Sequence, residues 1–412
     1  MNNWSEILLK DICDITRGAS PRPIHDFMTE DLDGIPWVKI SDATASNTRF
    51  IENTKGFIKK EGKNKSVSVI SGDLIVSNSA TPGLPKIMGI DACIHDGWLL
   101  LRNLNGVYKE FLFYLLTNDR KQIVSQGTGT VFTNLKTDIL KNHQIKLPPI
   151  SEQEEIASFL GSVDDKIELN QQMNQTLEEI AKTLFKSWFI DFDPVRAKAE
   201  GRPIALSKEI SDLFPDSFED SELGEIPRGW KAGNLGTFIE PKRGKVITKS
   251  KTTPGEVPVV AGGTKPPYYH SESNAIAPIV TISASGTAGY VNIYYEDIWA
   301  SDCSYINKEV TDFVFFAHSF LLINQERIYD LRHGAVQQHV YPKDLIELEM
   351  VTPPTSIIED YESKVSTFHE RIKCNLEEIK TLQSLRDFLL PKLISGELQI
   401  PDAEDLVEKA GM

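Results

Sequence analysis

Residues 151–190 read SEQEEIASFLGSVDDKIELNQQMNQTLEEIAKTLFKSWFI and directly follow a Pro-Pro pair at 148–149. Apolar and amide side chains recur in this stretch with a 4-3-4-3 spacing, from Ile156 to Trp188. This period is typical of a coiled-coil helix and differs from the alternation of a β-strand. A helix of this length would extend about 60 Å at roughly 1.5 Å per residue. Its apolar stripe needs a partner in water.

The same pattern occurs again half a chain length later. After the Pro-Pro pair at 353–354, apolar side chains recur with the same spacing from Ile358 to Leu389. We therefore expect the two helices to pair with each other in antiparallel orientation, with Asn170 opposite Asn375 near an approximate two-fold axis. A buried Asn pair costs stability but fixes the register of the helices. The alternative is that both asparagines face solvent.

The amino-acid composition limits the classes of protein to which the chain can belong. A chain of 412 residues with 40% hydrophobic and 25% charged residues is expected to form two or three globular domains. The N-terminus lacks the pattern of a signal peptide, and the longest apolar run, 313–323, is too short to span a bilayer. Four scattered cysteines without a CxxC motif fit a reducing cytoplasm and argue against disulfides and a zinc knuckle.

The net charge of −15 is unevenly distributed. The two large segments, 1–150 and 226–355, are close to neutral, and almost all of the negative charge lies in the helical segments, the stretch between them and the tail. Both large segments carry lysine and arginine clusters, which suit phosphate contacts but are also common in solvated loops.

The chain is organised as globule, helix, globule, helix. In the first globule we expect strands over 35–40, 73–77 and 144–147 and a helix over 109–117. The second globule restarts the first, because Trp4, Leu9 and Gly18 have the same spacing as Trp230, Leu235 and Gly244. The acidic, proline-bearing stretch between the first helix and the second globule is expected to be a connector with little core.

No motif predicts an active site. Residues 265–268 (KPPY) lack the acceptor that amino-methylating enzymes carry at the first position, and no nuclease, Walker or metal-ligand pattern has the required context. Hydroxyl, amide and basic side chains on Gly-rich turns and loops instead suggest contacts to phosphates and base edges, although ordinary turn capping is at least as common. The candidates are Arg17, Arg22, Lys59, Lys60, Ser77, Ser79, Thr81, Lys86, Thr128, Thr130, Asn134, Arg243, Lys245, Lys249, Ser283, Ser285, Thr287, Arg332, Gln337 and Gln338.

Four stretches together resemble the specificity (S) subunits of type I restriction–modification systems. They are LPPISEQEEIA at 147–157, the helical run 160–167, FKSWFIDFDPV at 185–195 and LPKLISGEL at 390–398. The second helix begins with TSII at 355–358 where the first has ISEQ at 150–153, which departs from the pattern of the first copy.

The resemblance implies an α+β fold in which a long antiparallel two-helix coiled coil separates two α/β target recognition domains, with an internal pseudo-two-fold repeat. The expected domains are 1–150 (target recognition domain 1), 151–190 (first spacer helix), 191–226 (acidic connector), 227–355 (target recognition domain 2), 356–396 (second spacer helix) and 397–412 (tail).

The resemblance also implies a non-catalytic subunit without a cofactor of its own. Each recognition domain would read one half of a bipartite, asymmetric site in double-stranded DNA. Two modification subunits, which would supply methyl transfer from S-adenosylmethionine to adenine N6, would dock on the helices, and restriction subunits would join them. Two other classes stay open: a stand-alone DNA-modifying enzyme, and a helical scaffold that binds only proteins.

Overall fold

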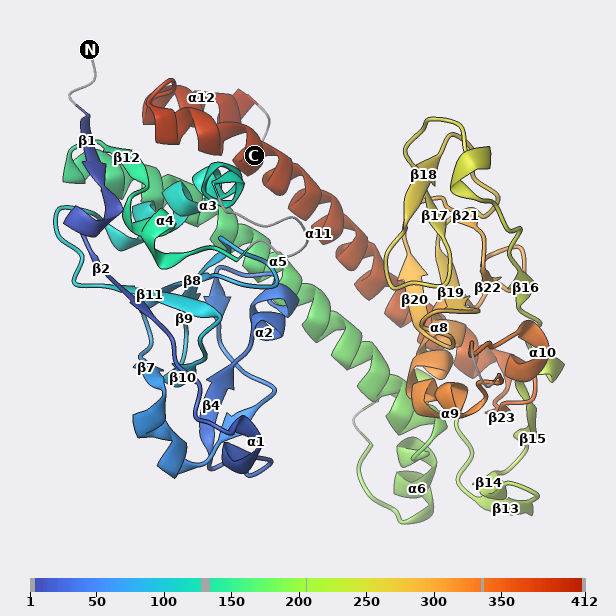
Figure 1. Cartoon of the computed structure of the whole chain (residues 1–412). Coiled ribbons are helices and arrows are strands. Elements are labelled where there is room, and N and C mark those ends of the chain that lie inside the picture. Colours follow the sequence, from blue (N-terminus) through green and yellow to red (C-terminus); the bar gives the residue numbers. More distant parts are fainter. Residues whose placement is uncertain (1–3, 127–133, 205, 335–336, 410–412) are drawn as a thin grey trace. The chain divides into compact units, whose positions relative to one another are not determined.

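The computed structural model describes residues 4–126, 134–204, 206–334 and 337–409. The chain forms two compact units, one comprising 1–171 and 376–412 and the other comprising 172–375. Each unit contains a β-rich domain and half of each of the two long helices, α5 (Ile150–Phe189) and α11 (Thr355–Ser395) (Figure 1). Among the described residues, no helix combines the length and apolar character needed to cross a bilayer.

The first domain contains two five-stranded sheets and a two-stranded pair. One sheet has the order β2 (Asp14–Arg17), β11 (Trp98–Arg102), β8 (Leu74–Ser77), β9 (Pro85–Met88), β5 (Phe50–Ile51). The other has the order β3 (Met28–Thr29), β6 (Phe57–Ile58), β4 (Ile35–Val38), β10 (Ala92–Ile94), β7 (Val67–Val69). The pair joins β1 (Ser5–Leu8) to β12 (Gln144–Leu147). Strands β8 and β11 are apolar runs because both of their faces are covered.

The helices of the first domain are α1 (Ile24–Phe27), α2 (Ile40–Ala45), α3 (Lys109–Ser125), α4 (Thr137–Lys141) and the 3₁₀ helices Leu9–Asp11 and Lys60–Lys65. Helices α2, α3 and α4 contact strands of the first sheet, whereas the helix Lys60–Lys65 contacts β7 of the other sheet. Buried residues run without a break from Phe111 to Leu116, which is typical of a helix enclosed on all sides. The expected strands at 35–40, 73–77 and 144–147 are confirmed as β4, β8 and β12, and the expected helix at 109–117 extends to Ser125.

The second domain repeats this plan. One sheet has the order β16 (Lys242–Arg243), β22 (Cys303–Ile306), β19 (Ile279–Ser283), β20 (Val291–Tyr294), and the other has the order β18 (Tyr268–His270), β17 (Val257–Val260), β21 (Trp299–Ala300). The pair of β15 (Lys231–Asn234) with β23 (Glu349–Thr352) corresponds to β1 with β12. The helices are α8 (Val314–Ile323), α9 (Gln325–Asp330), α10 (Pro342–Leu345) and the 3₁₀ helices Leu235–Thr237 and Lys249–Lys251.

The repeat expected from the sequence is confirmed in detail. The Leu9 N–H donates to the His143 carbonyl over 3.1 Å, and the Leu235 N–H donates to the Leu348 carbonyl over 2.8 Å. A Cβ atom on Gly18 would lie 2.1 Å from the backbone oxygen of His95, and one on Gly244 would lie 2.4 Å from that of Ser301. Glycine recurs at this position because the backbone of the neighbouring loop leaves no room for a side chain.

The long helices pair antiparallel within each unit. In the first unit Asp164 of α5 contacts Arg386 of α11, whereas Asn170, further along α5, contacts Glu378, which comes earlier in α11. Apolar residues spaced along the two seams share this interface: Val163, Ile167, Ile379 and Leu382. In the second unit the Tyr361 hydroxyl donates to the Ala181 carbonyl over 3.0 Å, among the rings of Phe185, Trp188 and Phe189.

Asn170 and Asn375 are both fully buried, so neither faces solvent. Asn375 Nδ2 donates to Asn174 Oδ1 over 2.7 Å, and Asn170 Nδ2 donates to Glu378 Oε2 over 2.9 Å. Each asparagine thus has a hydrogen-bond partner inside its own unit. Their role in setting the register stays a prediction.

Two segments have more structure than the sequence suggested. The stretch expected to be a connector forms α6 (Asp193–Ala199), α7 (Lys208–Ser211) and a hairpin of β13 (Phe218–Ser221) with β14 (Gly224–Pro227). It adds Phe192, Val195, Phe214 and Ile226 to the second core, so the expectation of little core is wrong there. The tail contains α12 (Ile400–Lys409), whose Ala403 is buried in the first core.

A buried imidazole pair connects the second domain to α11. The Tyr295 hydroxyl lies 2.6 Å from His369 Nδ1, and the rings of His318 and His369 are 5.6 Å apart. Burial lowers the pKa of His369 to about 4 and that of His318 to about 3. Both imidazoles are therefore neutral in the folded protein at neutral pH.

Acid is expected to destabilise this cluster. The folded pKa of His369 lies below its ordinary value of 6.5, so its contribution is complete above pH 6.5 and is lost as the pH falls toward 4. We expect the difference in unfolding free energy between the wild type and His369→Gln to change by about 2 kcal/mol between pH 7 and pH 5. Chemical denaturation at both pH values measures it, and parallel pH profiles would contradict the assignment.

Candidate nucleic-acid interface

Each domain has a serine-rich turn after an inner strand of its sheet. In the turn at 77–83 the Gly83 N–H donates to the Ser77 carbonyl over 2.7 Å, and in the turn at 283–289 the Gly289 N–H donates to the Ser283 carbonyl over 2.8 Å. Both glycines have positive φ, 73° and 84°, a conformation that favours glycine. The two domains therefore build the same turn from different sequences.

An arginine and an aspartate meet beside each turn. Arg17, the last residue of β2, donates from Nε to the Asp96 carbonyl oxygen over 2.9 Å. Arg243, the last residue of β16, donates from Nη2 to Asp302 Oδ1 over 2.8 Å. The turns contact the same loops, since the Ala284 N–H donates to the Asp302 carbonyl over 3.1 Å. Each domain thus places a guanidinium group at a corresponding point of the frame.

Serine hydroxyls fix both aspartates. Ser20 Oγ donates to Asp96 Oδ1 over 2.7 Å, and Ser285 Oγ donates to the Asp302 carboxylate. The Ser20 hydrogen bond lowers the pKa of Asp96 below its ordinary range. A carboxylate held ionised in this way stabilises the positive charge beside it and limits the directions in which the arginine extends.

A further loop reaches each turn from the region before the last strand. The Leu135 N–H donates to the Asn78 carbonyl over 2.8 Å, and the Val340 N–H donates to the Ala284 carbonyl over 3.1 Å. These contacts bring exposed amide side chains to the neighbourhood of the turns, namely Asn134 in the first domain and Gln337 and Gln338 in the second. Amides of this kind match the donor and acceptor pattern of adenine in the major groove.

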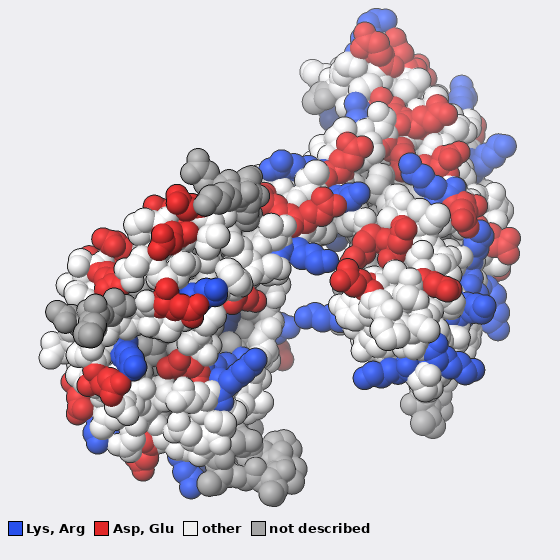
Figure 2. Space-filling model, turned by 90° about the horizontal axis from the view of Figure 1, so that it is seen from above, with Lys and Arg blue, Asp and Glu red and all other residues white. Residues whose placement is uncertain are grey.

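Aromatic rings support the basic side chains of the second domain. The Arg243 guanidinium lies 4.9 Å from the centre of the Tyr341 ring, which stacks on His339. Lys245 Nζ lies 5.9 Å from the centre of the Trp299 ring. Basic and acidic side chains are interspersed over the visible face of the molecule, and basic ones gather at an edge of the second unit (Figure 2). Stacked guanidinium groups lose less freedom on binding.

Several other candidates are exposed or lie on turns, and two lie outside the described residues. Arg22 is exposed at a cavity of about 700 Å³ that Trp37, His95 and Asp96 also line. Ser79, Thr81 and Thr287 lie on the turns, Arg332 is exposed, Lys60 and Lys249 begin 3₁₀ helices, and Lys59 Nζ donates to the Asp26 carbonyl. Thr128 and Thr130 lie outside the described residues.

Three candidates are buried and make contacts within the protein. Ser77 and Ser283 are buried at the starts of their turns. Lys86 is 6% exposed, and its ammonium group donates to the carbonyl oxygens of Ser46 and Thr48. Burial lowers the pKa of Lys86 to about 8. These positions do not offer their polar groups to a partner at the surface.

The candidates from the sequence do not include the groups that position the arginines, which are Asp96 for Arg17 and Asp302 and Tyr341 for Arg243. Both aspartates nevertheless occupy the loop that precedes the strand pairing with the arginine strand, so an alignment of the two repeats was a usable signal. Among the described residues, no group of three His, Cys, Asp or Glu side chains is arranged to hold a metal ion.

The family model for the type I restriction modification DNA specificity domain matches residues 1–179 and 227–383. The chain belongs to this family. The HindI specificity subunit of Haemophilus influenzae is 26% identical, covering 97% of this chain and 100% of the relative. The MjaIX specificity subunit of Methanocaldococcus jannaschii is 26% identical, covering 97% and 94%. This family comprises the non-catalytic DNA-recognition components of type I systems, so the chain is a non-catalytic specificity subunit.

The fold agrees with a solved member. The S subunit of a type I restriction–modification system from M. genitalium superposes with a TM-score of 0.57 at 16% identity, covering 95% of this chain and 96% of that one. The similarity extends over both β-rich domains and both long helices because it covers nearly the whole of each chain.

If the frame around Arg243 faces a duplex, removing this guanidinium should weaken electrostatic binding. We expect Arg243→Ala to make the slope of log K against log salt less steep by about one unit. Fluorescence anisotropy of the purified chain with duplex DNA between low and moderate salt measures this slope. Lys208→Ala, which removes an exposed lysine paired with Asp212, serves as a matched control and should leave the slope unchanged. Equal slopes for all three proteins would contradict the assignment.

Proposed function

We propose that this chain reads a bipartite, asymmetric DNA site, with one half-site for each β-rich domain. The observation that carries the proposal is the common frame: the turn recurs in both domains with the same backbone hydrogen bond, and beside it Arg17 donates to the Asp96 carbonyl and Arg243 to the Asp302 carboxylate. A common frame with different side chains is suited to present two readers to two different sequences. The domains at 1–150 and 227–355 are the units of recognition.

The two readers differ in chemistry. In the first domain the exposed groups near the turn include Arg17, Arg22 and Asn134, whereas the second offers Arg243 on an aromatic support and two adjacent glutamines. Arginine matches guanine and amides match adenine in the major groove. The half-sites are therefore expected to differ in sequence, which makes the whole site asymmetric.

The long helices set the distance between the half-sites and dock the catalytic subunits. Their segments carry most of the negative charge of the chain, which disfavours close approach to phosphates. They also expose large apolar side chains, namely Leu169, Ile180, Leu376 and Phe388. Exposed apolar groups within a polar surface suit protein partners. Two modification subunits dock here, restriction subunits join them, and the complex acts on cytoplasmic DNA.

The direct test is the methylation pattern. We expect co-expression of the chain with its modification subunit to produce N6-methyladenine in a two-part motif with a constant gap. Single-molecule sequencing of the host genome measures the motif. A short continuous motif would refute the reading by two separate domains, and methylation by the purified chain alone would favour a stand-alone enzyme.

A domain exchange tests the independence of the readers. Replacing residues 1–147 with the corresponding segment of a relative should change one half of the motif and leave the other half intact, because β1 to β12 form a complete domain. Genome-wide methylation mapping again provides the measurement. The reciprocal exchange of 227–352 is the matched control and should alter only the other half. A change in both halves after either exchange would contradict the proposal.

A further inference from the structure

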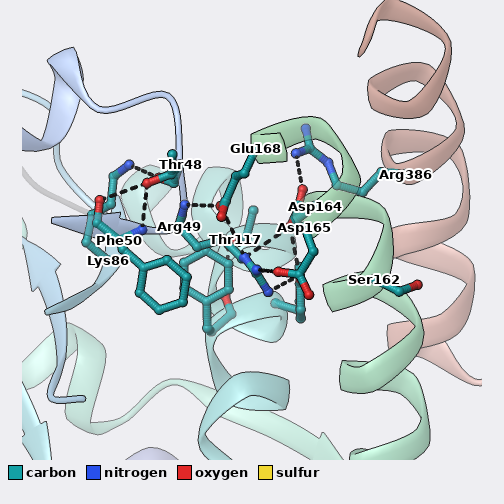
Figure 3. A network of polar contacts seen from close by, with 12 residues as sticks. Thr48, Arg49, Phe50, Lys86, Thr117, Ser162, Asp164, Asp165, Glu168 and Arg386 are labelled. Carbon is teal, nitrogen blue, oxygen red and sulfur yellow. Dashed lines mark hydrogen bonds and ion pairs between the residues drawn. The ribbon is translucent and has the colours of Figure 1, made fainter. Parts of the chain in front are cut away.

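One loop of the first domain contacts α5 through a dense cluster of charges. Arg49 forms an ion pair with Asp165, and its Nε lies 3.4 Å from Glu168 Oε1 and 3.9 Å from Asp164 Oδ2. The backbone N–H of Arg49 also donates to Glu168 Oε1 over 3.1 Å. Figure 3 shows these carboxylates of α5 gathered around Arg49, with Arg386 of α11 on the far side of Asp164. Burial alone would lower the pKa of Arg49, but the surrounding groups raise it above its ordinary value.

Asp164 connects this loop to two more helices. It is 4% exposed, accepts the Tyr114 hydroxyl of α3 over 2.7 Å and accepts Arg386 Nη1 of α11 over 2.7 Å. One carboxylate on α5 therefore links the domain with both long helices. Removing a partner from such a buried network leaves uncompensated charge, so the network holds its members in one arrangement.

The loop is equally well tied to the sheet. The buried Lys86 donates to the carbonyls of Ser46 and Thr48, and the Ile87 N–H donates to the Arg49 carbonyl over 3.0 Å. Arg49 directly precedes β5, the edge strand next to β9. The same sheet contains β2, which ends at Arg17, and β8, which leads into the serine-rich turn. A shift at Arg49 thus moves the candidate reading surface with it.

A cavity adjoins this part of the contact between the domain and α5. This cavity of about 930 Å³ lies beside the cluster, and its lining includes Thr48, Arg120, Ile167 and Leu390. Apolar contacts between the domain and the helix pair continue toward the start of α5, where Ile156 and Leu160 join the core. The domain is therefore packed near one end of the contact and fixed by ion pairs near the other.

In the second unit, a neutral imidazole contacts the β-rich domain at the matching position of its long helix. Counted from the Pro-Pro pairs, His369 of α11 occupies the position of Asp164 of α5. The Tyr295 hydroxyl contacts His369 Nδ1, and the Phe315 ring stacks on the imidazole with ring centres 4.1 Å apart. At these matching positions the first domain is held by ion pairs and the second by rings, although the Glu362 carboxylate of α11 also accepts from the Phe315 and Phe316 N–H groups.

We propose that Arg49 is the positioning residue that fixes the first recognition domain on the helix pair and thereby sets the length of the gap in the DNA site. This inference rests on the proposed bipartite function. Arg49 contacts no base in this scheme. It acts through the sheet, so its loss relaxes the gap without changing either half-site. Because the contacts of Arg49 are ion pairs, added salt weakens them as well. Their partial burial reduces this effect of salt.

The test compares Arg49→Ala with the wild type in the complex with the modification subunit. We expect the half-sites to be unchanged, and methylation at sites with a gap one base pair too short or too long, relative to correctly spaced sites, to rise about tenfold, equivalent to about 1.4 kcal/mol of positioning energy. Lys121→Ala is the matched control, since Lys121 is an exposed cation lining the same cavity and should retain a single gap.

A milder variant covers the case in which Arg49→Ala does not assemble. Glu168→Gln keeps the shape of the side chain and removes one charge that faces Arg49, and it should widen the gap to a smaller extent. A single wild-type gap in both assembled variants, or in Glu168→Gln where Arg49→Ala fails, overturns the inference. Altered half-site bases overturn it too, because Arg49 would then take part in reading. A wild-type complex without any two-part motif refutes the proposed function itself.

Discussion

The apolar seam between α5 and α11 is the constraint on which the rest of the structure depends. A helix of 40 residues with one apolar face has no stable existence in water, and full burial of each large side chain contributes about 1.5–3 kcal/mol. In each unit, half of α5 is covered by half of α11 and by a β-rich domain. The seam thereby decides the order of elements along the chain, because each domain must be followed by the helix that it covers.

Polar groups within the seam are expected to restrict how the helices can pair. Asn174 contacts Asn375, Asn170 contacts Glu378, and Asp164 contacts Arg386; we expect a shift by one turn to break these pairs and leave buried groups without partners. Apolar layers alone tolerate such shifts far better. Such polar groups cost stability but favour one position of each domain along the helices, which is what the proposed reading of two spaced half-sites requires.

The sequence predicted the long helices to within a residue or so, because a 3.5-residue period over 40 positions is a strong signal. It also predicted the repeat, since glycine and leucine recur where the backbone demands them. The packing of residues 191–226 was missed because Phe192, Phe214 and Phe218 follow no period. The burial of Lys86 was not predictable because a sequence displays charge and not burial. Arg386 is charged at a position of the apolar pattern of α11 because its guanidinium pairs with Asp164 of α5.

On the proposed reading surface, the Asp302 carboxylate beside Arg243 would limit the electrostatic attraction that otherwise dominates DNA binding. A free guanidinium group on the surface binds any phosphate, and such binding carries no sequence information. When a carboxylate already occupies part of the guanidinium, a phosphate offers less gain, and a base edge must complete the remaining hydrogen bonds in a fixed direction. A lower affinity for any phosphate, together with a fixed hydrogen-bond direction, favours discrimination between base sequences over tight binding to DNA of any sequence. That balance is consistent with a chain whose net charge is negative although both of its domains carry basic groups at corresponding points.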